Sequence, residues 1–237
     1  MRYILDAHTH SIASGHGSTD TITHMVKAAY ERGLTLLGIT EHGPATILSC
    51  KPSYFQGLAT APNHRCGIEV LYGAELNIMN VNGDLDLDDM ISEKLDYVIA
   101  GLHGPLMVPS NAEDHLRAYI QAMKHPYVKV IAHCDDVRYP VDYEKLLQAA
   151  MEYGVILEIN NSSLSPNGYR GNTKKNVRRI LELCKAYDYP VLLSSDSHGK
   201  EHIGDFQYAL PLIEETHFPE ELILNTSTEY FKKYICR

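Results

Sequence analysis

Two histidines one residue apart follow the first apolar run of the chain, in the stretch "DAHTH" at residues 6–10. On an extended chain this spacing points both side chains to the same side, so His8 and His10 can reach a single ion. Asp196 and His198 repeat the spacing near the other end of the chain, in "SSDSH". Imidazole nitrogens mixed with carboxylate oxygens suit zinc, and also iron or manganese. The two pairs therefore indicate a metal site.

Further histidines and one glutamate follow other short apolar runs or lie in the loop behind them. They are His16, His42, Glu75, His103 and His133. Together with the two pairs they are too many ligands for one tetrahedral ion, and with a shared carboxylate they would serve about three ions. Clustered metals hold a phosphoryl group from several sides and lower the pKa of a bridging water. The predicted chemistry is therefore metal-dependent hydrolysis of a phosphate ester.

The elements that must position these side chains are seven short runs rich in Val, Ile and Leu. They span residues 2–5, 34–40, 69–74, 96–102, 128–132, 154–159 and 190–195. Because they are apolar on both alternations, they read as strands buried on two faces, as in a parallel sheet. Segments with helical spacing stand between them, at 20–33, 111–125, 142–154 and 173–188. This alternation predicts an α/β fold whose sheet is closed into a barrel or open and doubly wound.

The candidate ligands fall mainly at the carboxyl ends of the predicted strands. In an α/β barrel these ends share one face, which is where active sites are built. Seven of the thirteen histidines belong to this set, and a random scatter would not coincide with strand ends in this way. No linker-like composition divides the chain, so we expect one domain over residues 1–237.

Charge and composition restrict the partners. The formal net charge of −9 makes the chain a poor partner for nucleic-acid backbone. The same charge would repel a phosphorylated substrate, unless bound cations reverse the sign locally. No stretch of about 18 apolar residues predicts a membrane span, and the first apolar run is too short for a signal peptide, so we expect a cytoplasmic protein. The five cysteines form no C-x-x-C pair, which argues against a zinc ribbon and a disulfide framework.

The order of these motifs resembles the PHP superfamily, named for polymerase and histidinol phosphatase. The matching pieces are "DAHTH", "GITEHG", "GAELN", "GLH", "IAHCD", "EINNSS", "SSDSH" and "GDF", from the first strand to near the end of the chain. The length and the "EINNSS" segment are most similar to the small YcdX-type phosphatases. The resemblance implies a distorted (β/α)7 TIM-like barrel with a trinuclear site, usually zinc, with manganese or iron as alternatives.

The resemblance also implies which residues hold each ion. One ion would take His8, His10, Glu75 and Asp196; a second Glu75, His103 and His133; a third His16, His42 and His198. A hydroxide that bridges metals would attack phosphorus while Glu75, Asp196 and His103 hold the ions that stabilise the transition state. Asp135 is a candidate for protonating the leaving alcohol.

Other roles are expected near this site. Arg170 is a candidate for binding the substrate, because a guanidinium can hold a phosphate at two points. Asn161 is a second candidate for binding the substrate, with fixing its own loop as the alternative. Asp6, one strand step deeper than the ligands, is expected to orient a histidine. The long segment 43–67 reads either as a lid, with Tyr54 and Phe55 at the mouth, or as a short helix packed on the barrel.

Alternatives remain for the reaction. A histidinol-phosphate phosphatase or a nucleotide or oligonucleotide phosphoesterase would use the same chemistry. A metal-dependent amidohydrolase also carries His-x-His after its first strand, but those barrels normally hold one or two ions. A metal-binding barrel without activity is the third alternative, and a full ligand set argues against it. The expected partner is a small phosphorylated substrate, and a homo-oligomer is possible.

Overall fold

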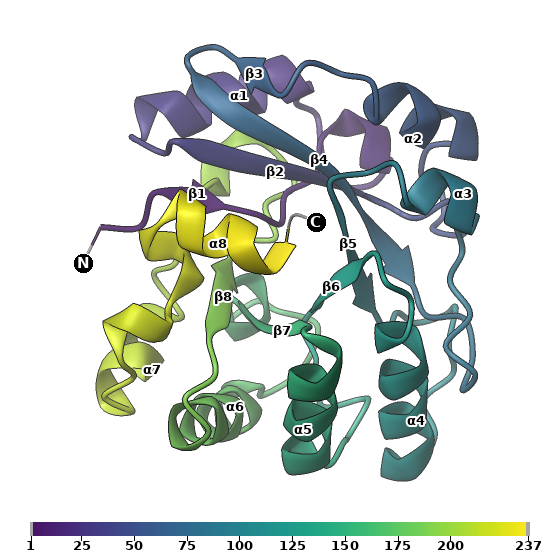
Figure 1. Ribbon diagram of the computed structural model, residues 1–237, viewed down its shortest axis with the longest axis vertical. Coiled ribbons are helices and arrows are strands. Elements are labelled where there is room, and N and C mark those ends of the chain that lie inside the picture. The colour runs from purple at the N-terminus through teal and green to yellow at the C-terminus, as the bar shows by residue number, and fades with distance from the viewer. Residues whose placement is uncertain (1, 236–237) are drawn as a thin grey trace.

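Seven parallel strands form a nearly closed barrel in the computed structural model, which describes residues 2–235 (Figure 1). Their order in the sheet is β1-β2-β4-β5-β6-β7-β8. The bounds are β1 Leu5–Asp6, β2 Leu36–His42, β4 Ile68–Asn77, β5 Tyr97–Gly101, β6 Val128–Ile131, β7 Ile156–Asn160 and β8 Val191–Ser194. A short strand, β3 His64–Arg65, pairs antiparallel with β4. The predicted α/β class and barrel of seven parallel strands are confirmed.

Burial explains why these strands are apolar on both faces. Every residue of β2, β5, β7 and β8 is buried, because one face of the sheet looks into the barrel and the other meets the helices. Each of the seven apolar runs of the sequence coincides with one of the parallel strands, to within a few residues at either end.

Asn225 closes the gap between the first and the last strand. The segments after β1 and β8 meet through one bridge, in which the His10 N–H donates to the Ser197 carbonyl at 2.8 Å. Deeper in the barrel the buried Asn225 side chain takes the place of strand pairing. Its amide donates to the carbonyls of Leu5 (3.0 Å) and Leu193 (2.8 Å) and accepts from the Leu193 N–H (2.8 Å).

We expect Asn225→Ala to lower the free energy of unfolding by about 3 kcal/mol, since each buried backbone group left unpaired costs about 1–3 kcal/mol. Urea denaturation measures this loss. Asn172, which is exposed, is the matched control, and Asn172→Ala should stay within about 0.5 kcal/mol. Equal stability of both variants with the unmodified protein would contradict a closing role for Asn225.

The helices surround the barrel and occupy most of the connections between its strands (Figure 1). Their bounds are α1 Ile22–Glu31, α2 Pro52–Leu58, α3 Asp89–Ser92, α4 Ala112–Met123, α5 Tyr143–Tyr153, α6 Lys174–Ala186, α7 Leu210–Glu215 and α8 Thr228–Ile235. The four predicted helices are α1, α4, α5 and α6. In α4 the Asn111 side chain accepts from two backbone N–H groups, as its sequence position at the start of the helix predicted.

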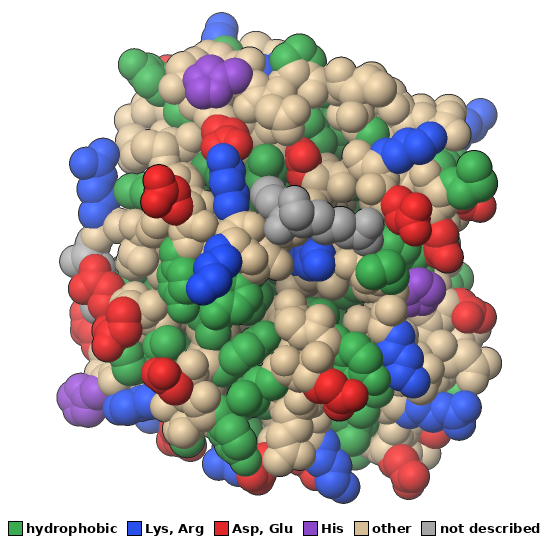
Figure 2. Space-filling view, in the orientation of Figure 1, with side chains coloured by type: hydrophobic (Ala, Val, Ile, Leu, Met, Phe, Trp, Pro, Cys, Tyr) green, Lys and Arg blue, Asp and Glu red, His purple; other side chains and the backbone are tan. Residues whose placement is uncertain are grey.

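The position of helix α8 shows which end of the barrel is open. Phe231 and Ile235 of α8 pack into the apolar interior, and Phe231 lies edge-on to Tyr97, the first residue of β5. Helix α8 therefore covers the end at which the strands begin. Figure 2 shows basic and acidic side chains interspersed on the face that carries α8, without a broad basic patch. The opposite end, where the strands finish, is left for the site.

The segment 43–67 is mainly a packed connection. It contains α2 and β3, and Phe55 is completely buried in the core between sheet and helices. Of the two interpretations of this segment, buried Phe55 agrees with a short helix packed on the barrel, and Tyr54 packs against the neighbouring core around α1. Over residues 2–235, no helix has the length and apolar character needed to cross a bilayer.

Candidate metal centre

The predicted ligands lie at the end of the barrel where the strands finish. His42 is the last residue of β2, and Glu75 stands two residues before the end of β4. The remaining seven follow β1, β5, β6 and β8; they are His8, His10, His16, His103, His133, Asp196 and His198. Parallel strands bring their carboxyl ends together, so segments far apart in the chain meet here.

Glu75 lies at the centre of the group. Its Oε1 is 2.8 Å from His133 Nε2 and 3.1 Å from His103 Nε2. Its Oε2 is 2.6 Å from His42 Nδ1. One oxygen of Glu75 and one nitrogen each of His103 and His133 lie within 4.8 Å of one another, which suits a shared ion. The structure therefore brings together the set expected for the second ion.

The set expected for the first ion also converges. His8, His10 and Glu75 each offer an atom within 4.8 Å of the others. Asp196 Oδ1 lies 3.2 Å from His10 Nε2 and 3.7 Å from His8 Nε2. The two histidine nitrogens and this oxygen are buried and have no hydrogen-bond partner within residues 2–235. Buried polar atoms rarely remain in that state, and a cation between them would satisfy all three.

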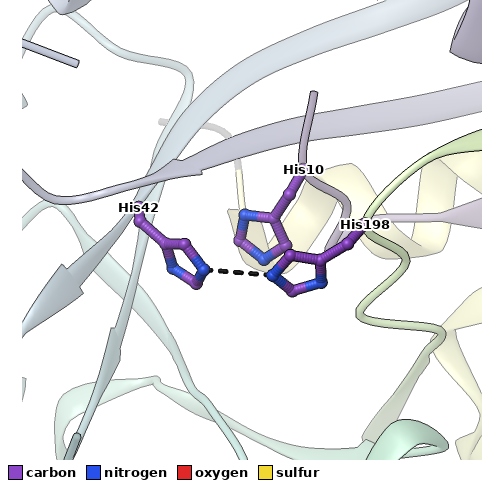
Figure 3. A group of neighbouring side chains, drawn as sticks. All are labelled: His10, His42 and His198. Carbon is purple, nitrogen blue, oxygen red and sulfur yellow. Dashed lines mark hydrogen bonds between the residues drawn. The ribbon is translucent and has the colours of Figure 1, made fainter. Parts of the chain in front are cut away.

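A third group lies at the outer side of the centre. The rings of His10, His42 and His198 point toward one another, and His42 Nε2 and His198 Nε2 are 3.1 Å apart (Figure 3). The ring of His16 stacks on His42 with centroids 4.6 Å apart and lies 5.3 Å from His198. The expected third set thus forms one cluster of rings, with His10 adjoining it.

A buried carboxylate that the sequence interpretation missed orients the ligands. Glu158 Oε1 accepts from His8 Nδ1–H at 2.6 Å and from the Ser194 hydroxyl, and its Oε2 accepts from the His133 N–H at 2.7 Å. The bond between Glu158 and His8 Nδ1–H turns His8 Nε2 toward the centre. Carboxylates commonly orient metal-binding histidines in this way. The signal in the sequence that could have revealed Glu158 is its position as a glutamate inside the apolar run 154–159.

Asp6, which we expected to orient a histidine ring, forms its side-chain hydrogen bonds with the segment after β8. Its carboxylate accepts from the backbone N–H and hydroxyl of Ser195 and from the Gly204 N–H at 2.8 Å. These bonds hold the chain that leads to Asp196. Asp196 itself adopts a left-handed backbone conformation, with φ of 52°. Aspartate adopts this conformation more readily than most residues other than glycine.

His10 is oriented through a serine. Ser14 Oγ donates to Glu41 Oε2 at 2.5 Å and lies 3.1 Å from His10 Nδ1, from which it accepts. Glu41 also accepts from the N–H of Ser11 at 3.0 Å. The acidic residue before His42 is thus not a ligand but holds the loop after β1, and His10 Nε2 is left facing the centre.

Arg170 and Asn161 have different surroundings. Arg170 is buried, and its Nη2 donates to Asp196 Oδ2 at 3.2 Å while Nη1 donates to Ser163 Oγ at 3.3 Å. A guanidinium has five N–H donors, so others remain for a substrate oxygen. Asn161 Oδ1 instead accepts from the backbone N–H groups of Tyr208 and Ala209, at 2.8 and 3.1 Å. The oxygen of Asn161 therefore fixes a loop, which is the alternative role expected for this residue.

The electrostatics favour bound cations. Burial works to lower the pKa of His8, but the carboxylates of Glu158, Glu75 and Asp196 outweigh it and hold this pKa well above its usual range. Burial, together with the charge of the nearby arginine, lowers the pKa of His133 to about 4, so His133 is neutral, as a metal ligand must be. Although burial opposes it, His8 and neighbouring histidines hold the pKa of Glu75 well below its usual range. The centre thus combines an ionised Glu75 carboxylate with a neutral His133 ring, a mixture of groups that suits a divalent cation.

Asp135 is a buried carboxyl group beside the centre. Neither of its oxygens has a hydrogen-bond partner among the described residues. Burial raises its pKa to about 7, with the charge of Arg170 acting in the opposite direction. The carboxyl group of Asp135 is therefore poised to hold or release a proton near neutral pH.

The comparison with known families agrees with this geometry. The model of the PHP domain matches residues 6–165, which is more than half of the chain. The chain belongs to the PHP domain family. A protein of Thermoanaerobacter sp. (strain X514), named a probable phosphatase, is 40% identical to this PHP protein over 236 residues. The match covers 99% of this chain and 95% of the Thermoanaerobacter protein.

A second relative is a probable phosphatase of Caldanaerobacter subterraneus subsp. tengcongensis. It is 41% identical to the PHP protein, covering 99% of this chain and 92% of its own. Among solved structures, the histidinol phosphate phosphatase of Lactococcus lactis, complexed with zinc, L-histidinol and phosphate, superposes with a TM-score of 0.66. Its sequence identity is 22%, covering 92% of this chain and 95% of the other, so this likeness shows the shared fold. The expectation of a PHP-family phosphatase is confirmed at the level of the family.

Proposed function

We propose that this PHP protein hydrolyses the phosphate ester of a small molecule in a centre of three divalent ions, with zinc as the first candidate and manganese or iron as alternatives. One observation carries the proposal: nine histidine and carboxylate side chains from distant segments converge on one face, and several of their buried nitrogen and oxygen atoms lack hydrogen-bond partners in the described part of the chain. The relatives named as phosphatases and the zinc and phosphate of the Lactococcus structure support it.

The contacts support the following ligand sets. His8, His10, Glu75 and Asp196 would hold one ion, because their free atoms face one another. Glu75, His103 and His133 would hold the second. His42 and His198 would hold the third, with His16 stacked beside them. We assign His10 to the first ion, because its Nε2 lies 3.2 Å from Asp196 Oδ1.

Bound divalent ions would supply Lewis acidity and neutralise the charge that develops on the phosphoryl oxygens. The chain itself must then orient the ester and move protons. Arg170, held against Asp196, has N–H donors for a phosphoryl oxygen. Asp135, with a pKa of about 7, is our candidate for giving a proton to the leaving alcohol. Burial of these groups excludes water and strengthens their interactions with the phosphate.

Metal analysis combined with a substrate panel tests the proposal. We expect zinc-loaded or manganese-loaded protein to contain close to three equivalents of metal and to release phosphate from p-nitrophenyl phosphate and from a subset of phosphorylated metabolites. Preference for bis(p-nitrophenyl) phosphate would favour an oligonucleotide phosphoesterase, and cleavage of amides alone an amidohydrolase. One equivalent of metal without phosphate release would refute the proposal.

A further inference from the structure

An apolar pocket opens beside the metal centre. It has a volume of about 260 Å³, just below the usual range of about 300–1,000 Å³ for pockets that bind drug-sized ligands. Three candidate ligands, His16, His42 and His103, contribute to its lining. Its walls include Ile47 and Leu48, from the loop after β2. A small group attached to a phosphate in the centre would reach this pocket directly.

The loop that carries Ile47 and Leu48 is held in place by both of its neighbours. The Leu48 carbonyl occupies the space of a side chain at Gly15, where an added Cβ would lie 2.0 Å from its oxygen. At the start of the loop, the Ala45 N–H donates to Asp86 Oδ2 at 2.9 Å. Leu48 adopts a left-handed conformation with φ of 68°, which is unusual for a bulky residue.

This loop presents apolar surface to solvent at the mouth of the site. The exposed fractions are 72% for Ile47 and 76% for Leu48. Because these two side chains are exposed, they contribute little to the core, although the backbone at Leu48 is strained. Strain of this kind concentrates at sites that bind ligands. These two side chains therefore have area that a bound ligand can cover.

A fixed aromatic ring forms another wall. Tyr169 lines the pocket, and two guanidinium groups lie near its ring, with Arg138 Cζ at 5.0 Å and Arg170 Cζ at 4.9 Å from the centroid. Arg138 is held in turn by Asp136 through Nε–Oδ1 at 2.9 Å and Nη2–Oδ2 at 2.5 Å. The ring is therefore pre-positioned as a flat surface.

We propose that this pocket binds the alcohol part of the phosphate ester and selects an apolar, planar group over a polyol. The inference rests on the proposed function, since it places the phosphate on the metal centre. A separate polar pocket, lined by Asp196 and His198 and in part by Asn167 and Gln207, is where a polyol would be held instead. The apolar pocket is preferred because it combines three ligand residues, the displayed aliphatic side chains and the fixed ring.

Two phosphonates that cannot be hydrolysed test this selection without interference from leaving-group reactivity. Phenylphosphonate and methylphosphonate share the anionic group and differ only in the apolar part. Calorimetric titration of zinc-loaded protein should show phenylphosphonate binding at least about 10-fold more tightly, since even one methylene in an apolar pocket is worth about that factor. Equal affinities, or tighter binding of methylphosphonate, would overturn the inference.

Single substitutions locate the effect. Leu48→Ala and Ile47→Ala should each remove most of the preference for the phenyl group and leave the affinity for methylphosphonate unchanged. Met90, exposed to 72% and outside the pocket, is the matched control, and Met90→Ala should keep the full preference. A preference that survives both pocket variants would overturn the inference. Failure of the proposed function is seen separately, as phosphonate binding without any phosphate release from esters.

Discussion

Glu75→Gln is expected to lower kcat/KM for phosphate-ester hydrolysis by at least about 1,000-fold, equivalent to about 4 kcal/mol of transition-state stabilisation. The reason is that one carboxylate meets ligands of more than one ion. Its Oε1 lies 2.8 Å from His133 Nε2, and its Oε2 lies 3.6 Å from His10 Nε2. A neutral amide would leave these positions short of negative charge, so the metal content should fall by at least one equivalent.

Mass spectrometry of the bound metal and steady-state kinetics measure the two effects together. Glu152→Gln is the matched control, because Glu152 is exposed on α5 and should bind metal and turn over as the unmodified protein does. Thermal unfolding of the metal-free Glu75→Gln variant should match that of the metal-free unmodified protein, which would separate a loss of activity from a loss of fold. Full metal content with unchanged kcat/KM in this variant would rule out a bridging role for Glu75.

The second large effect, a loss of metal affinity, is expected from Glu158→Gln. The Glu158 side chain would touch neither metal nor substrate. Its carboxylate accepts from four donors, including Asn160 Nδ2 at 3.0 Å and the His133 N–H at 2.7 Å. A glutamine amide would turn an N–H₂ group toward one of these donors and weaken the hold on His8. Loss of such an orienting partner typically costs 10–100-fold in metal affinity.

Competition with a zinc chelator measures the affinity of the Glu158→Gln variant. Because Glu158 is buried, thermal unfolding should also shift to lower temperature, and Ser194→Ala, which removes a single donor, should show a smaller version of both effects. An orienting role further predicts that excess zinc restores part of kcat, which a collapsed site would not allow. Unchanged zinc affinity in Glu158→Gln would contradict the role assigned here.

Much of the site could be predicted because its ligands stand in a regular place in the sequence. Seven of the candidate ligands follow or end a buried apolar run, and parallel strands place such positions on one face of a barrel. They are His8, His10, His42, His103, His133, Asp196 and His198. The strands themselves were visible because burial on both faces removes polar residues from them. Local rules were therefore enough for the class of fold, the face of the site and the kind of chemistry.

What only the tertiary structure decided are contacts between distant segments. Glu158 reaches His8 across 150 residues, and Asn225 reaches Leu5 across 220. No spacing rule connects such pairs, because their meeting depends on how the whole barrel closes. The same holds for Asp6 and Asn161, whose side chains satisfy backbone groups of loops rather than a histidine or a substrate. The sequence by itself predicted the candidate metal ligands, and the barrel decided what orients them, because orientation is set by neighbours in space and not by neighbours in the chain.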